Sequence, residues 1–246
     1  MILPISLVVV SFLTGLALLW VFGKTSNQAA VKLTKKRLQA RLLEMRLYGD
    51  DPGTVWKAQK ALLELNARYL ALMLRPALFA TAPMVLLLIV MDGFYGRRPL
   101  EPNHAAIVTV QLANAGDAEL EVPAGIEVET PAVRALSDSQ VSWRIRPTQD
   151  ISGELRVVSG GVSATKSVRA GEGIGYLASR RVGSAVSWLI HPGEMPLAEA
   201  GFEWIELEYP SANVSMFGIS THWLVWFAIF SMGPAYLLKG RFGVTL

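Results

Sequence analysis

The chain has 246 residues, of which 23 are Lys or Arg and 20 are Asp or Glu, so its net charge is +3, and it contains no cysteine. The lack of cysteine excludes disulfides, thiolate metal sites and a cysteine nucleophile. A hydrophobic fraction of 52% is high for a soluble domain and indicates that about a quarter of the chain lies in lipid.

Residues 1–23 carry no charged side chain. At about 1.5 Å per residue they are long enough to cross a hydrocarbon core of about 30 Å. The segment lacks the basic start of a signal peptide, and no A-x-A-like cleavage site follows it. We therefore expect a retained transmembrane helix here.

Residues 24–75 form a basic segment in which apolar residues recur at alternating spacings of three and four, the a/d seam of a coiled coil. The seam positions are Val31, Leu38, Leu42 and Met45, with Lys35 as a polar exception, and then Val55, Ala58, Leu62, Leu65, Tyr69 and Leu72. Between the two halves, residues 49–53 (GDDPG) supply a helix stop, acidic caps and a proline suited to a helix start. The sequence predicts a hairpin of two antiparallel helices. Its exposed basic face would hold Lys32, Lys36, Arg37, Arg41, Lys57, Lys60 and Arg68.

Two further apolar segments are expected to cross the membrane. Residues 76–91 lie between Arg75 and Asp92 and are shorter than the usual 18 or more, so this helix would tilt little or thin the bilayer. Residues 214–238 contain only His222 as an ionisable group, and several aromatic residues suit an interfacial belt.

The distribution of charge predicts the orientation. Residues 24–75 have eleven basic and four acidic side chains, net +7, whereas residues 92–218 have ten basic and sixteen acidic, net −6. Lys and Arg accumulate in short cytoplasmic loops. We therefore expect the N-terminus and residues 92–213 outside, and the hairpin and the tail 239–246 in the cytosol.

Five stretches of the N-terminal part carry a family pattern: 36–46 (KRLQARLLEMR), 49–50 (GD), 55–60 (VWKAQK), 66–69 (NARY) and 73–83 (MLRPALFATAP). In these stretches the chain resembles the YidC/Oxa/Alb superfamily of membrane insertases, especially its small archaeal YidC-like members. The likeness covers residues 1–91 and, by topology, 214–246. It implies a prokaryotic plasma (inner) membrane and a partly hydrated groove that lowers the cost of moving a polar flank of a client helix across the bilayer.

The implied groove needs polar or helix-bending residues within the apolar helices. The candidates are Ser6, Ser11, Thr14, Arg75, Thr81, Pro83, Ser231 and Pro234. Small hydroxyl residues and prolines are also common at dry helix contacts in membranes, so a wet groove and a dry contact both stand as interpretations. The chain differs from the bacterial members in having no basic residue deeper than Arg75, and from the small relatives in having residues 92–213 in place of a short connection.

Residues 92–213 are predicted to form an immunoglobulin-like β-sandwich, because short runs alternate apolar and polar residues between turn formers. The expected strands are 104–112, 140–146, 153–158, 162–169 and 202–209. Ser159-Gly160-Gly161 suits a hairpin turn, Trp143 suits the core, and residues 170–196 are expected to be loops.

No catalytic pattern emerges. His104, His191 and His222 are far apart and lack metal-ligand spacing, so we expect no enzyme activity, metal or cofactor.

The sequence favours an insertase-like protein or chaperone for membrane proteins. Its partners would be the lipid bilayer, client membrane proteins, and the ribosome or other membrane-complex subunits. The alternative is a non-catalytic accessory or scaffold subunit of a larger membrane complex, which binds an unidentified outer partner through the β domain.

Overall fold

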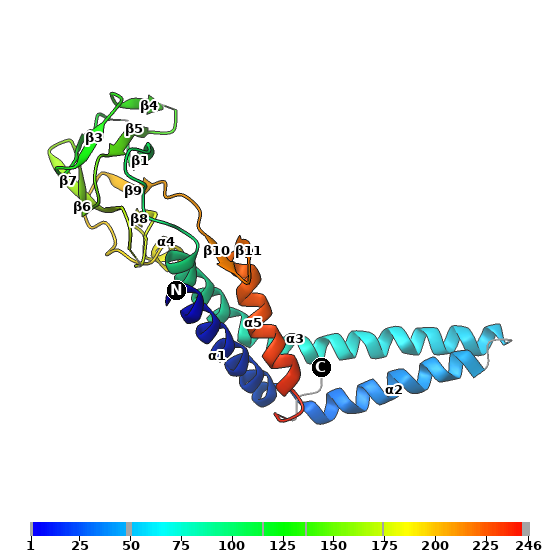
Figure 1. The fold of residues 1–246 in the computed structure, drawn as a ribbon. Coiled ribbons are helices and arrows are strands. Elements are labelled where there is room, and N and C mark those ends of the chain that lie inside the picture. The colour runs from blue at the N-terminus through cyan, green and yellow to red at the C-terminus, as the bar shows by residue number, and fades with distance from the viewer. Residues whose placement is uncertain (1, 48–50, 115, 136, 174, 243–246) are drawn as a thin grey trace. The chain divides into compact units, whose positions relative to one another are not determined.

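The computed structural model describes residues 2–47, 51–114, 116–135, 137–173 and 175–242. They belong to two units. One contains the residues up to Val85 together with those from Leu224, and the other runs from Leu86 to Trp223. The first is helical and the second is mostly β, as labelled in Figure 1.

Four long helices account for the apolar and basic segments: α1 (Ile2–Thr25), α2 (Gln28–Leu47), α3 (Pro52–Tyr95) and α5 (Trp223–Leu238). Side-chain caps define two of their starts. Asn27 accepts a hydrogen bond from the Ala30 amide at 3.0 Å, and Asp51 accepts one from the Gly53 amide at 3.0 Å. The capping predicted at Asp51-Pro52-Gly53 is thus confirmed, while Gly49 and Asp50 lie outside the described residues.

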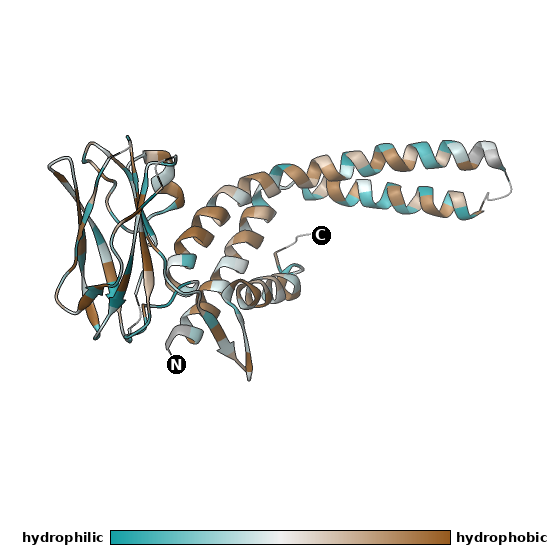
Figure 2. Ribbon diagram, turned by 90° about the horizontal axis from the view of Figure 1, so that it is seen from above, coloured by the Kyte–Doolittle hydropathy of each residue, from teal (hydrophilic) through white to brown (hydrophobic). Residues whose placement is uncertain are grey.

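The second arm of the hairpin and the second apolar segment are one helix. α3 has 44 residues, contains Pro76 and Pro83, and ends at Tyr95, four residues after the predicted boundary. The ribbon mixes teal and brown along the hairpin and is mainly brown along the rest of α3 (Figure 2). Among the described residues, two stretches, Pro4–Thr25 and Val55–Tyr95, are long and apolar enough to cross a membrane.

The segment 214–238 is not a single helix. Its first residues complete a β-hairpin of β10 (Asn213–Met216) and β11 (Ile219–His222), and α5 begins only at Trp223. Phe217 and Gly218 have φ of 53° and 79°, the left-handed pair that a two-residue hairpin turn requires. α5 has 16 residues and extends about 24 Å, less than a hydrocarbon core of about 30 Å.

The basic hairpin is formed by α2 and the first half of α3, which lie side by side (Figures 1 and 2). Val31 and Ala58 are buried, as the seam predicts. In the first arm, however, Thr34 is buried in place of Lys35, and Leu42 is 55% exposed. Burial of Thr34 costs little because its hydroxyl donates to the Ala30 carbonyl at 2.8 Å, whereas burial of the Lys35 ammonium would be expensive.

The second unit is built on two antiparallel sheets. One has the order β3-β5-β1-β9-β8 with β4 paired to β5, and the other has the order β2-β6-β7. The strands are β1 (Ala106–Leu112), β2 (Glu119–Glu121), β3 (Ile126–Val128), β4 (Val133–Ala135), β5 (Gln140–Pro147), β6 (Ile151–Ser159), β7 (Val162–Ala170), β8 (Arg180–Val182) and β9 (Phe202–Leu207).

Both sheets contribute to one hydrophobic core, in which Val108 and Trp143 from the larger sheet join Leu155 and Val157 from the smaller. The prediction of a β-rich domain is confirmed, as are the strands that alternation indicated and the place of Trp143. Gly160 and Gly161 form the β6–β7 turn with φ of 57° and 80°, as expected.

Residues 170–196 are more ordered than expected, since they contain β8 and the short helix α4 (Ala185–Ile190). α4 begins where the Ser184 hydroxyl accepts a hydrogen bond from the Ser187 amide at 3.1 Å. A run this short shows no helical period that a sequence pattern could reveal.

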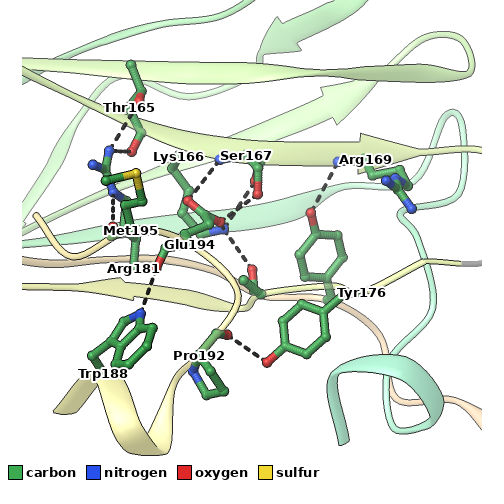
Figure 3. A network of polar contacts seen from close by, with 12 residues as sticks. Thr165, Lys166, Ser167, Arg169, Tyr176, Arg181, Trp188, Pro192, Glu194 and Met195 are labelled. Atoms are coloured by element: carbon green, nitrogen blue, oxygen red, sulfur yellow. Dashed lines mark hydrogen bonds and ion pairs between the residues drawn. The ribbon is translucent and has the colours of Figure 1, made fainter. Parts of the chain in front are cut away.

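A buried ion pair ties this segment to β7. Lys166 is 0% exposed, donates to the Ala178 carbonyl at 2.7 Å and pairs with Glu194 (Figure 3). Burial lowers the pKa of Lys166, and the Glu194 carboxylate opposes that shift. The Ser167 hydroxyl also donates to Glu194, at 2.5 Å, so the carboxylate is held from two neighbouring residues.

We predict that Lys166→Met and Glu194→Gln each lower the free energy of unfolding by about 3–5 kcal/mol, because each leaves an uncompensated buried group. The double variant should lose less than the sum of the two. Unfolding of the full chain in micelles, followed by tryptophan fluorescence, measures this. The control is Arg156→Gln in the exposed Arg156–Glu121 pair, where we expect less than about 1 kcal/mol. Strictly additive losses for the buried pair would contradict the coupling.

Candidate functional site

A close helix contact in the helical unit joins α1 to α5. Leu7, Ser11, Gly15 and Leu19 are buried at every fourth position of α1, which places them on one face. A Cβ added to Gly15 would overlap the backbone carbonyl of Ser231 on α5. Only glycine therefore allows the two backbones to come this close, as in the small-residue contacts of membrane helices.

The hydroxyl groups at this contact are satisfied by their own helices. The Ser11 hydroxyl donates to the Leu7 carbonyl at 2.6 Å, and the Thr14 hydroxyl donates to Val10 at 2.7 Å. The Ser231 hydroxyl donates to Ala228 at 3.3 Å. Such back-bonding lets a serine or threonine lie in an apolar setting at low cost.

The eight groove candidates, all of which the structure describes, do not gather in one place. Ser11 and Ser231 are buried at the α1–α5 contact. Ser6, Thr14 and Pro234 are partly buried, and Arg75, Thr81 and Pro83 are exposed on α3. The Thr81 hydroxyl donates to the Ala77 carbonyl at 2.8 Å. The candidates therefore divide into a packed contact between α1 and α5 and exposed residues on α3.

The open face of α3 combines apolar side chains with a backbone irregularity. Arg75, Phe79 and Pro83 are spaced four residues apart and are all exposed, so they share one side of the helix. Proline has no amide hydrogen, so Pro83 leaves the Phe79 carbonyl without its usual donor four residues on. We call this place, Arg75 together with the Phe79 carbonyl and Pro83, the α3 notch.

Arg75 and Pro83 stand out in the sequence as separate candidates, whereas Phe79, whose backbone carbonyl connects them, was missed. The signal was present in the four-residue spacing and in the rule that a proline frees the carbonyl of residue i−4. Gly15 was also missed. Its signal was the small-x-x-x-small pattern that it forms with Ser11.

All seven residues of the predicted basic face are exposed. Three of them, Arg37, Arg41 and Arg68, also line a cleft of about 560 Å³ between α2 and α3. The small side chains of Ala40 and Ala61 leave space for the cleft, and Glu44 and Glu64 complete its charged lining. Arg41 pairs with Glu44 at 2.5 Å. Guanidinium groups in this number suit the phosphates of lipid headgroups or RNA.

The β unit contains a second cleft, of about 490 Å³, beside β8 and α4. The Arg180 guanidinium lies 4.2 Å from the centre of the Trp204 ring and pairs with Glu206 at 2.6 Å. Burial lowers the pKa of His191 in the cleft wall, and the positive charge of Arg180 adds to the shift. No group of three or more possible metal ligands occurs among the described residues.

No protein-family model, curated protein or solved structure matches this chain. Its likeness to the YidC/Oxa/Alb superfamily is therefore a proposal that rests on the residues quoted above.

We predict that Gly15→Ala lowers the free energy of unfolding of the helical unit by about 1–3 kcal/mol, because the added methyl group forces α1 away from α5. The matched control is Gly233→Ala on α5, where a Cβ meets nothing within 4 Å and where alanine should stabilise the helix by about 0.5–1 kcal/mol. Titration of micelles with a denaturing detergent, read by tryptophan fluorescence, compares the two. Equal behaviour of the two variants would mean that the α1–α5 contact does not form.

Proposed function

We propose that this protein is an insertase-like or chaperone membrane protein of the YidC/Oxa/Alb kind, with an added β domain of immunoglobulin-like type. In this proposal α1, α3 and α5 cross a prokaryotic plasma membrane, with the N-terminus outside and the hairpin in the cytosol. The observation that carries it is the continuity of α3, which joins an arm of the basic hairpin to an apolar segment with an open polar notch.

The proposed mechanism reduces the length of dry path that a client's polar flank must cross. An unpaired amide or charge in hydrocarbon costs several kcal/mol. In the α3 notch, the Phe79 carbonyl offers an acceptor and Arg75 offers donors about one turn away. Water drawn to these groups would hydrate one side of α3 from the cytosolic end, and a client beside it would lose less hydration on entry.

The basic hairpin would serve as the receiving surface. Its exposed cations attract anionic headgroups within about 8 Å at physiological salt and also attract the phosphates of ribosomal RNA. In both cases a client that leaves the ribosome would be held near the mouth of the notch.

A second candidate function is that of an accessory subunit that docks in a larger membrane complex. The α1–α5 contact supports it, because the hydroxyls of Ser11 and Ser231 donate within their own helices and the helices pack through Gly15, as in dry helix contacts of membrane proteins. The β domain would then bind the outer partner.

We expect that a membrane-impermeant thiol reagent, applied from the cytosolic side, labels Phe79→Cys in the native membrane more strongly than Thr81→Cys, which lies on the opposite side of α3. The absence of cysteine from the chain makes every single-cysteine variant unambiguous. Ser11→Cys is the buried control and should stay unlabelled, and Lys57→Cys on the hairpin should be labelled fully. Protection of both α3 positions would contradict the hydrated notch and favour the accessory subunit.

We further expect that Arg75→Gln reduces the insertion of a client with a short polar outer tail several-fold in proteoliposomes, because the notch then loses the guanidinium charge and most of its N–H donors. Protection of the translocated tail from added protease measures insertion. Arg46→Gln, which removes a cation from the hairpin far from α3's apolar segment, is the matched control. Equal insertion by Arg75→Gln and the unmodified chain would show that the notch has no part in transfer.

A further inference from the structure

The helix α4 presents apolar side chains that do not belong to the core of the β unit. Val186 is 73% exposed and Met195, just after the helix, is 81% exposed, and Leu189 and Ile190 are exposed as well. Residues 182–190 carry no charge. Exposed apolar side chains gathered in one short segment in this way mark an interaction site in a folded protein.

The β10–β11 hairpin presents a similar tip. Phe217 is 84% exposed and adopts the left-handed conformation at the turn, and Ile219 beside it is also exposed. Val214 and Met216 on the inner face are buried. Residues 211–221 are again uncharged, so the tip presents an aromatic and an aliphatic side chain with no charge beside them.

Within the β unit, the side chain of Tyr176 joins the segment that follows α4 to the last turns of α3. The Tyr176 ring packs so closely against Gly93 of α3 and against Gly193 that a Cβ on either glycine would overlap it. The Tyr176 hydroxyl donates to the Pro192 carbonyl at 2.6 Å (Figure 3), and the Leu177 amide donates to Gly93 at 2.9 Å. α4 is therefore tied to the end of α3 within this unit.

The hairpin has an equally short connection to the apolar helices. β11 ends at His222, the residue before the start of α5. At the other end of the hairpin, the Ala212 amide donates to the carbonyl of Gly96, which directly follows α3, at 2.9 Å. Both apolar surfaces are thus held where the chain leaves α3 and enters α5.

We infer that α4, Met195 and the β10–β11 tip form a surface anchor that inserts into the interface of the lipid bilayer on the side from which α3 emerges. The inference rests on the proposed placement of α3 and α5 in a membrane. The occupant is lipid because the patches adjoin the ends of apolar helices, where aromatic and aliphatic side chains settle at headgroup level, about 5–10 Å deep. Trp188 fits this depth, since its indole nitrogen donates to the Glu194 carbonyl at 2.9 Å and needs no water.

The test uses the full chain in phosphatidylcholine vesicles, with a bimane label on Val186→Cys, Leu189→Cys or Met195→Cys. Lipids that carry a doxyl group near the headgroup quench labels at the interface, and iodide quenches labels in water. Val133→Cys on β4, another exposed valine of the same unit, is the matched control. We expect lipid quenching to be several-fold stronger at Val186 and Leu189 than at Val133, with the opposite order for iodide.

Iodide quenching at Val186 and Leu189 as strong as at Val133 would overturn the anchor, and so would protection from both quenchers, which would mean that protein covers the patch. Leu78→Cys, exposed on α3, distinguishes failure of the anchor from failure of the proposed membrane placement. If lipid quenches Leu78 but not Val186, the anchor alone is wrong. If lipid quenches neither, the membrane placement itself is wrong.

Discussion

The structure depends most on the continuity of α3. This helix runs for 44 residues and passes through Pro76 and Pro83 without ending, although a proline inside a helix in water costs about 3 kcal/mol or more. In hydrocarbon the alternative is worse, because a broken helix exposes several backbone groups that each cost several kcal/mol. A single helix through both prolines is the outcome expected when lipid, and not water, surrounds the second half of α3. The same continuity joins the basic hairpin to the apolar segment.

Much of the fold could be predicted because local chemistry determined it. The capping at Asp51-Pro52-Gly53 and the glycine turn at Gly160-Gly161 each depend on residues a few positions apart, and strand alternation reports directly on the two faces of a sheet. The β10–β11 hairpin was missed because residues 214–222 are nearly free of charge and merge with the apolar helix that follows. The Phe217-Gly218 turn was the only local sign of it. The phase of the first hairpin arm differed by one residue, since three- and four-residue spacings are close and only burial decides between Thr34 and Lys35.

The site was predictable in its residue types but not in its grouping. Hydroxyl residues and prolines in apolar helices stand out in a sequence. Ser11 and Ser231, however, are 220 positions apart, and only the packing of α1 against α5 brings them into one contact. The consequence is physical. A serine bonded to its own helix and packed against a glycine is a structural contact, while the exposed Thr81 on α3 faces whatever surrounds the protein. One residue type thus has two roles that depend on the face it occupies.

The exposed leucine and phenylalanine side chains of α3 do not by themselves require a partner, because lipid tails are as apolar as the side chains they would contact. The Phe79 carbonyl is different. Without the amide that Pro83 lacks, it needs another donor, and leaving it unpaired in dry lipid costs several kcal/mol. Water, the nearby Arg75 or a donor from another protein can supply the bond, and the first two define a hydrated notch whereas the third defines a docking surface. The two proposed functions therefore differ in which donor forms a hydrogen bond with the Phe79 carbonyl oxygen. The position of Arg75, one turn away, favours the hydrated notch.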